Sequence, residues 1–388
     1  MKLTINQKVL EKALAHANGI IERKQAVPIL GYVLFEAIPE KGLKMTSTNM
    51  DMTIVDTIDC EISAPGKYCL PAGLLYDITK KIKVGSDILF EASKENNSIQ
   101  VTSNKASFSI HYMESDGFPP IADLNYDVSF MMNTDILKKS IDVAKVAMLQ
   151  DNSRFHLNGI HMHYENELGN INIRFVATDL FRIACVSAKA PQEVQTMEPI
   201  IVSKRTVTEF LKLIEGSPDK ETKVSVSENR ISFNLQSAEK IQTEFSSRLI
   251  SGTFPEYKAA LDVSNDKILI INTSDFIEAL DRVSTVVMDS TNSVKLNIFS
   301  DKLVLSGVSR ELGSATEEIE ATFNALEPLE ICFNSRYLLE VLREIETPQV
   351  RLLLAESNSS TIIKPINTDG ASDIDMVFAI MPIEIVKN

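Results

Sequence analysis

The feature that most constrains the folding of this 388-residue chain is an internal repeat. Three segments share one plan: a short apolar strand pattern, a polar step, and then apolar residues at helical spacing. They are residues 3–6 leading to 9–10, residues 130–133 leading to 136–137, and residues 268–272 leading to 276–277. Self-similarity at a fixed period indicates repeated structural units. Aligning on Leu10, Leu137 and Ile277 gives three nearly equal parts, so we predict domains over residues 1–127, 128–258 and 259–388.

Each third also contains a second strand-to-helix step, at residues 70–75, 202–207 and 333–338. Apolar spacing near 3.6 residues predicts helices that bury one face. The six predicted helices cover residues 8–17, 74–83, 135–145, 204–214, 275–283 and 336–345. Between them, alternation with period two predicts antiparallel strands, as in residues 98–102, 107–111, 294–298 and 303–305. The predicted fold class is α+β, with two helices packed on antiparallel sheets in each repeat.

The charge distribution differs between the helices and the whole chain. The chain has 39 Lys and Arg against 53 Asp and Glu, a net charge of -14, whereas basic residues outnumber acidic ones in the six predicted helices. A solvated helix surface is the plain explanation. The alternative is that the helices line one concave surface that faces the phosphates of double-stranded DNA without reading its sequence. Twelve helices about 10 Å apart would surround a hole of about 30 Å, so a ring around DNA requires a dimer.

The sequence contains no motif that indicates an enzyme or a cofactor site. It contains no GxxxxGK[ST], GxGxxG or HExxH motif. His161-x-His163 is at most half of a metal site and reads better as a polar strand face, so we predict no metal and no cofactor. Four scattered cysteines without a CxxC pair indicate reduced thiols. Without an apolar run of membrane length or a signal-peptide pattern, we predict a cytoplasmic protein with no membrane partner.

Several segments match a known family over essentially the whole chain. They are Val27-Pro28-Ile29-Leu30-Gly31, Arg154-Phe155-His156-Leu157-Asn158-Gly159, Ala177-Thr178-Asp179-Leu180-Phe181-Arg182, Phe254-Pro255-Glu256-Tyr257 and Val377-Phe378-Ala379-Ile380-Met381-Pro382-Ile383. On these segments, the chain resembles the bacterial DNA polymerase III beta subunit, the family of sliding clamps. The resemblance implies a head-to-tail homodimeric ring that keeps the replicative polymerase on DNA. A clamp loader would open it, and the DNA polymerase III catalytic subunit and other proteins with a clamp-binding motif would dock on it.

The resemblance also implies which residues bind partners. Carried over by position, the peptide pocket comprises Leu157, Thr178, Leu180, Arg182, Ile183, Pro255, Ala260, Ser360, Met381, Pro382 and Ile383. The DNA-facing residues are Lys24, Gln150, Arg154, Phe155 and His156. Lys204 and Arg205, at the start of a basic helix, join that set. The dimer contact falls on Phe108 and Ile110 against Thr285 and Val286. From the residues alone, Phe108 and Ile110 are an ordinary alternating strand face.

The sequence departs from the family pattern in three places. Leu180-Phe181 stand where the family usually has Gly-His, so the pocket rim is bulkier. A basic pair common at the start of the second helix is Gly73-Leu74 here. The tail continues past Ile383 with an acid, Glu384, where the family often has arginine. The competing hypothesis is a repeat-built scaffold that binds peptides and never meets DNA, and the acidic total would suit either.

Overall fold

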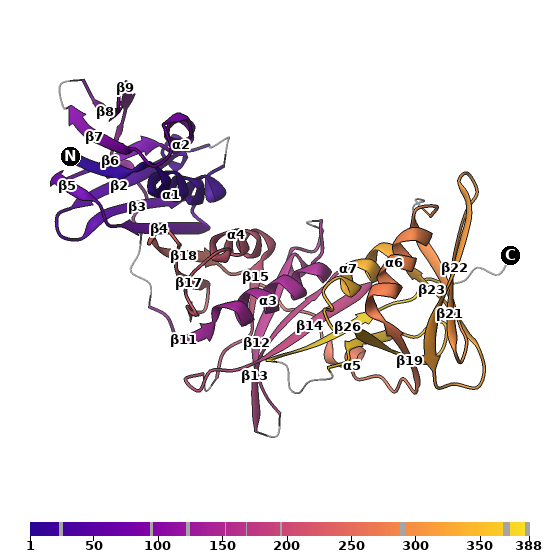
Figure 1. Ribbon diagram of the computed structural model, residues 1–388. Helices are drawn as coiled ribbons and strands as arrows, with labels where there is room; N and C mark the ends of the chain where they lie inside the picture. The colour runs from indigo at the N-terminus through magenta and orange to yellow at the C-terminus, as the bar shows by residue number, and fades with distance from the viewer. Residues whose placement is uncertain are drawn as a thin grey trace. The chain divides into compact units, whose positions relative to one another are not determined.

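The computed structural model describes residues 1–22, 26–93, 96–121, 125–151, 153–167, 169–194, 196–287, 292–367 and 373–384. The chain forms two compact units (Figure 1). The first comprises residues 1–138, 191–197 and 205–249, and the second comprises residues 139–190, 198–204 and 250–388. Each unit is described by itself below.

The first unit contains two antiparallel sheets. The nine-stranded sheet runs in the order β10 (Met113–Glu114), β6 (Gly66–Pro71), β2 (Tyr32–Ile38), β3 (Gly42–Thr48), β4 (Met52–Ile58), β18 (Gln242–Arg248), β17 (Arg230–Gln236), β16 (Glu221–Val226) and β11 (Val128–Asn133). The five-stranded sheet runs β5 (Glu61–Ala64), β1 (Lys2–Asn6), β7 (Asp87–Ser93), β8 (Ser98–Ser103) and β9 (Ala106–His111). Helices α1 (Gln7–Ile20), α2 (Ala72–Lys81) and α4 (Lys204–Ile214) accompany these sheets, and α1 packs against α2, β3 and β4.

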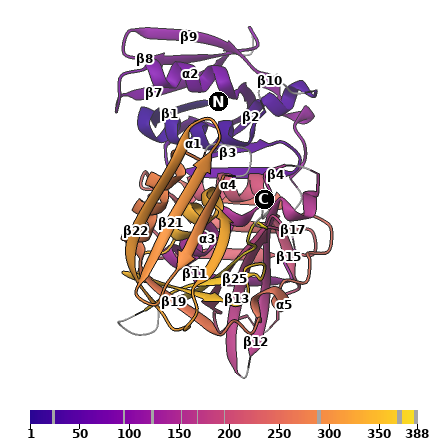
Figure 2. The same ribbon diagram turned by 90° about the vertical axis from the view of Figure 1, so that its right-hand side faces the viewer.

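The second unit contains one twelve-stranded antiparallel sheet. Its order is β15 (Ile200–Ser203), β12 (Gly159–Glu167), β13 (Asn170–Thr178), β14 (Arg182–Lys189), β26 (Ile374–Ile380), β25 (Thr361–Pro365), β24 (Gln349–Leu354), β19 (Lys267–Asn272), β22 (Gly313–Phe323), β21 (Lys302–Ser309), β20 (Ser293–Ile298) and β23 (Leu329–Asn334). Helices α5 (Lys258–Leu261), α6 (Thr273–Ser284) and α7 (Ser335–Leu342) belong to this unit, and α3 (Thr134–Ala144) begins in the first unit and ends in the second. The hairpin of β21 and β22 is seen along its length in Figure 2.

Four helices begin at an asparagine that ends the preceding strand, which explains the polar step in the repeat. The side-chain oxygens of Asn6, Asn133, Asn272 and Asn334 each accept a hydrogen bond from a backbone N–H of the first helical turn. An asparagine in this position satisfies a donor that has no partner inside the helix. The same local chemistry therefore starts a helix four times, on α1, α3, α6 and α7.

The helices bury the faces that their spacing predicts. Leu10, Ala13 and Leu14 of α1 are fully buried in a core with Phe35 and Phe90. In the second unit, Phe276, Ala279 and Leu280 of α6 are equally buried. The α+β class is confirmed, because each third of the sequence supplies two helices and antiparallel strands at the predicted places.

Candidate functional site

The turn between β13 and β14 carries three of the predicted pocket residues in a fixed conformation. The Thr178 hydroxyl donates to the Arg182 carbonyl oxygen at 2.8 Å and accepts from the Leu180 N–H at 3.1 Å. Asp179 Oδ1 accepts from the N–H groups of Phe181 and Arg182, each at 3.0 Å. Leu180 has a φ of 78°, a left-handed conformation that costs a side chain with a Cβ about 1–2 kcal/mol. The hydrogen bonds on both sides hold Leu180 there, with 47% of its surface exposed.

Arg182 is the buried charge of this region. It is only 4% exposed, and its Nε lies 3.0 Å from Asp179 Oδ2 while its Nη1 lies 2.7 Å from Glu340 Oε2. Its guanidinium also lies 4.3 Å from the ring centre of Tyr337 on α7. A buried cation needs such partners, because an unpaired charge in this environment is strongly unfavourable. Arg182 therefore ties the β13–β14 turn to helix α7.

Two pKa shifts reflect this arrangement. Burial alone would raise the pKa of Glu340, but hydrogen bonds from Arg336 and Arg182 outweigh it and hold the pKa below its ordinary value. Burial, with the nearby Asp179 carboxylate, raises the pKa of the Tyr337 phenol. At neutral pH, Glu340 is thus a carboxylate and Tyr337 a neutral phenol.

Large apolar side chains are exposed at the rim. Phe181 is 59% exposed and its ring stacks at 6.3 Å on that of Tyr337, while Met381 is 46% exposed. The Met381 N–H donates to the Phe181 carbonyl oxygen at 2.8 Å, so the segment after β26 lies beside the turn. Exposed apolar groups gathered in one place are typical of a surface that binds a partner. The bulky rim expected from Leu180-Phe181 is therefore part of an apolar surface.

The other predicted pocket residues lie around this rim. Leu157 is fully buried and Ile183 is partly buried, and both belong to an apolar cluster with Phe254 and Tyr257. Pro255 lies between those two aromatic residues, and Ala260 is on α5, which packs against β26. Ser360 precedes β25, whose Thr361 pairs with Ile380 of β26. Ile383 lies beside β23, where its N–H donates to the Cys332 carbonyl oxygen at 2.8 Å.

Sequence reasoning missed two residues of this region, Tyr337 and Glu340. Both lie on α7, more than a hundred residues from the turn that they contact, and neither belongs to a segment that matched the family. Only the packing of α7 against β26 and the turn reveals them. A signal was present in the sequence, because Tyr337 and Glu340 are three residues apart and so share one face of the helix.

The predicted DNA-facing residues fall in three places. Gln150, Arg154, Phe155, His156 and Lys204 belong to the second unit, where Lys204 Nζ donates to Gln150 Oε1 at 2.6 Å. Arg205 belongs to the first unit and pairs with Glu22 and the Ile20 carbonyl oxygen. Lys24 lies outside the described residues. Phe155 is 59% exposed and its ring meets that of His156 edge to face.

The predicted dimer contacts lie at strand β9 and at the end of helix α6. Strand β9 is the edge of the five-stranded sheet, and Phe108 on it is partly buried. Ile110 is only 3% exposed, so it packs in the core of its own unit. Thr285 is exposed after α6, and its hydroxyl donates to the Arg282 carbonyl oxygen. An interface here would rest on Phe108 rather than on Ile110.

The two histidines of the predicted polar strand face form part of a packed cluster. The His161 and His163 rings lie 5.0 Å apart, and His161 stacks on Phe254 at 4.6 Å. His163 Nε2 lies 2.8 Å from the Tyr257 hydroxyl. Burial lowers the pKa of His161 to about 4, and the neighbouring His163 ring contributes. Among the described residues there is no group of three metal-ligating side chains, and the four cysteines are free.

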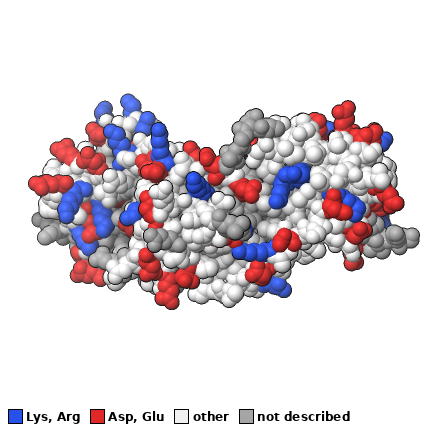
Figure 3. Space-filling model, turned by 90° about the horizontal axis from the view of Figure 1, so that it is seen from below, with Lys and Arg blue, Asp and Glu red and all other residues white. Residues whose placement is uncertain are grey.

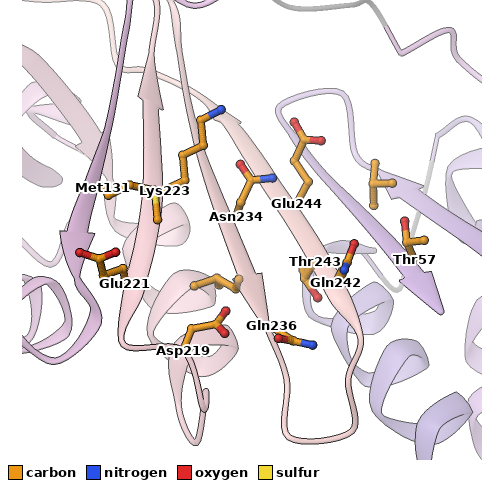
Figure 4. A pocket seen from close by; sticks show the side chains of 12 residues that line it. Thr57, Met131, Asp219, Glu221, Lys223, Asn234, Gln236, Gln242, Thr243 and Glu244 are labelled. Atoms are coloured by element: carbon orange, nitrogen blue, oxygen red, sulfur yellow. The ribbon is translucent and has the colours of Figure 1, made fainter. Parts of the chain in front are cut away.

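A polar hollow of about 470 Å³ lies on the nine-stranded sheet (Figure 4). It is lined by Thr57, Gln242, Asn234, Lys223, Glu244 and neighbouring side chains of β4, β11, β16, β17 and β18. Its lining brings together amides, hydroxyls and carboxylates without a nucleophile and base pair. On the face shown in Figure 3, Lys and Arg side chains lie among Asp and Glu side chains.

Comparison with known proteins identifies the chain. Three domains of one protein match it in order: the DNA polymerase III beta subunit N-terminal domain over residues 1–122, its central domain over residues 131–256, and its C-terminal domain over residues 259–382. The chain belongs to the DNA polymerase III beta subunit family. The beta sliding clamp of Caulobacter vibrioides is 31% identical over 99% of this chain and 100% of its own length. That of Pseudomonas aeruginosa is 28% identical over the same shares.

Solved structures of this family have the same fold. The sliding clamp of Bartonella birtlesii bound to griselimycin has a TM-score of 0.91 at 30% identity, covering 99% of this chain and 100% of its own. The Caulobacter crescentus clamp, with PEG bound to a putative beta-motif tethering region, has the same TM-score and identity and covers 99% of each chain. This chain is accordingly a DNA sliding clamp and not an enzyme, and nothing supports the scaffold that never meets DNA. No helix in the described part of the chain is long and apolar enough to cross a membrane.

Proposed function

We propose that two copies of this clamp close head to tail into a ring around duplex DNA. The observation that carries the proposal is the match of all three beta-subunit domains, in order, along the chain. A single chain supplies six of the repeat helices, and a ring wide enough for a duplex needs about twelve. We place the domains at residues 1–127, 128–258 and 259–388, and the site of action in the cytoplasm.

The ring retains the replicative polymerase by topology. A clamp loader opens it, and the polymerase III catalytic subunit and other proteins with a clamp-binding motif dock on the pocket around the β13–β14 turn. An apolar surface flanked by backbone polar groups suits a short extended peptide. The exposed Phe181 and Met381 side chains support this assignment. Because the Bartonella birtlesii clamp binds griselimycin, we propose that the same pocket of this chain binds it too.

Around the duplex, the proposed phosphate contacts come from Lys24, Gln150, Arg154, Lys204 and Arg205, with Phe155 and His156 beside them. These contacts carry no base information, so the ring can slide. Their contribution falls with salt, whereas topological linkage does not. This difference provides the test of the function.

The first experiment compares retention on nicked circular DNA and on the same DNA cut once, after loading. Retention on circles that survives high salt, together with loss from free linear ends, is the expected result. Equal, salt-sensitive loss from both substrates would contradict encirclement, because phosphate contacts alone weaken equally on both.

The dimer contact is tested by Phe108→Asp, with Ser107→Asp on the other face of β9 as the matched control. We expect Phe108→Asp to convert the dimer to monomers, because it places a charge in an apolar contact. Sedimentation measures the mass. A dimer that persists for Phe108→Asp would remove this residue from the interface.

A further inference from the structure

Four charged side chains form a continuous network of ion pairs between helix α7 and the β13–β14 turn. Arg336 Nε lies 2.9 Å from Glu340 Oε1, and Glu340 Oε2 lies 2.7 Å from Arg182 Nη1. Arg182 Nε in turn lies 3.0 Å from Asp179 Oδ2. The first member is on the surface, with 72% of the Arg336 side chain exposed, and Arg182 is 4% exposed. The ion-pair network therefore extends from an exposed side chain of α7 to a buried side chain at the base of the pocket rim.

The carboxylate of Glu340 is shared. One oxygen pairs with the exposed Arg336 and the other with the buried Arg182. A change at Arg336 therefore alters the strength of the ion pair between Glu340 and Arg182. Buried hydrogen-bonded ions polarise one another in this way. Tyr337, on the same turn of α7, contacts both the Arg182 guanidinium and the Phe181 ring. The position of the rim thus depends on α7.

We propose that Arg336 and Glu340 couple the partner pocket to DNA. This inference rests on the proposed function. A DNA phosphate that binds Arg336 withdraws it from Glu340, which then holds Arg182 more firmly and fixes Phe181 against Tyr337. A pocket that is already ordered loses less entropy on binding, so partner affinity rises on DNA. By linkage, a partner in the pocket strengthens the phosphate contact at Arg336 by the same factor.

Helix α7 provides its own control. Arg343, at the end of the helix, is also exposed, but it pairs with Asp281 of α6 and has no link to the turn. The equivalent helix α4 offers a second contrast. Its Arg205 occupies the position of Arg336 in the repeat, yet it pairs with Glu22 and the Ile20 carbonyl oxygen, while Glu209 pairs with Lys212. Among the described residues, only the α7 pair thus connects a helix arginine to the pocket rim.

The test measures griselimycin binding to the full-length clamp by calorimetry. We expect Glu340→Gln to weaken binding at least fivefold and Arg336→Gln to tighten it at least twofold. The deciding comparison is the double variant: Arg336→Gln should have no effect in the Glu340→Gln background. Arg343→Gln should change nothing in either background, although it removes the same charge.

Each outcome has a meaning. If Arg336→Gln acts equally in both backgrounds, or Arg343→Gln acts like it, the effect is one of net charge and the coupling is overturned. If the wild-type clamp binds griselimycin and all variants bind it alike, the proposed coupling is rejected and the assignment of the pocket is retained. If the wild-type clamp does not bind griselimycin, the pocket assignment and the coupling fall together.

Two measurements separate coupling from damage to the fold. Glu340→Asp retains the carboxylate and should recover part of the lost affinity, which a general loss of structure would not allow. On clamps loaded onto nicked circles, griselimycin should bind the wild type at least twofold more tightly than it binds free rings. Arg336→Gln should abolish that difference, and a difference that persists in Arg336→Gln would overturn the proposal.

Discussion

The same turn occurs twice in this molecule, and only one copy belongs to the proposed pocket. In the first unit, the Thr48 hydroxyl donates to the Met52 carbonyl oxygen at 2.9 Å, and Met50 has a φ of 77°. In the second, Thr178 does the same for Arg182 at 2.8 Å, and Leu180 has a φ of 78°. The flanking strand also matches, because Arg248 N–H donates to the Asp51 carbonyl oxygen as Met381 N–H does to that of Phe181.

The difference lies in the side chains around an almost identical backbone. In the β3–β4 turn, which lies beside β18, a buried Met52 occupies the place of Arg182, and Asp51 occupies that of Phe181. Thr206 on α4, whose hydroxyl lies 2.6 Å from that of Ser247, occupies the place of Tyr337. Helix α4 has a carboxylate, Glu209, at the place of Glu340, so the difference lies in the aromatic ring of the helix and in the buried cation of the turn. Substitutions at three pairs of matched positions, and the response of the two turns to pH, test this view.

The largest effect is expected at the buried position of each turn. Arg182→Leu leaves Asp179 without its cation and removes one of the two arginines that pair with Glu340. Breaking a buried pair in this way costs about 3–5 kcal/mol. Met52→Leu preserves volume and should cost less than about 1.5 kcal/mol. Hydrogen exchange of the turn amides measures the local stability, and griselimycin binding should be lost only in Arg182→Leu. Similar costs at both turns would mean that Arg182 acts as a packing residue.

The capping residues should separate charge from hydrogen bonding. Asn49 Oδ1 accepts from the N–H groups of Asp51 and Met52, as Asp179 Oδ1 does in its own turn. We expect Asn49→Ala to cost about 1 kcal/mol and Asp179→Ala about 2–3 kcal/mol, because the second also removes a partner of a buried cation. Asp179→Asn, which keeps the acceptor, should lie between them. The readout is again exchange of the turn amides, and an Asp179→Asn variant as stable as the wild type would contradict the role of charge.

Glycine in the left-handed position should affect both turns equally in stability but not in binding. Replacing Met50 or Leu180 by Gly removes about 1–2 kcal/mol of backbone strain but gives the unfolded chain more freedom, so the net change should be under about 1 kcal/mol. Leu180→Gly should nevertheless weaken griselimycin binding severalfold, since 47% of Leu180 is exposed at the rim. Unchanged binding would exclude Leu180 from the pocket, and Met50→Gly is the control.

The fold could be predicted because its signals are local and repeated. The asparagine steps and the spacing of apolar residues place α4 at its observed bounds and the other five predicted helices within a few residues of theirs. The continuous sheets could not be predicted, because the pairing of β4 with β18 and of β14 with β26 joins strands far apart in the sequence. Local periodicity contains no information on such partners.

The candidate site could be predicted only in part. Thr178, Leu180 and Arg182 were available from one contiguous segment, and the structure brings them together with Met381. The sequence could not distinguish surface from interior, and the structure shows that Leu157 and Ile110 are both buried within the single chain. Tyr337 and Glu340 required the packing of α7, since an ion pair between distant segments leaves no pattern in either segment.

The smallest expected difference between the two turns is in their response to pH. Because hydrogen bonds from Arg336 and Arg182 overcome the effect of burial, the pKa of Glu340 is lowered in the folded protein. A lowered pKa means that its contribution is complete above the ordinary value of 4.5 and is lost as pH falls through the folded value. The counterpart turn has the neutral Asn49 and Met52 where Asp179 and Arg182 stand.

Acidification from about pH 6 to about pH 3 should therefore lower the exchange protection of the Phe181 and Arg182 amides more than that of the Asp51 and Met52 amides. The charged groups near Glu340 are Arg336, Arg182 and, beyond Arg182, Asp179. Glu340→Gln removes the titrating group and should reduce the difference between the turns. Equal loss of protection at both turns would show that the ion-pair network does not stabilise the β13–β14 turn more than its counterpart.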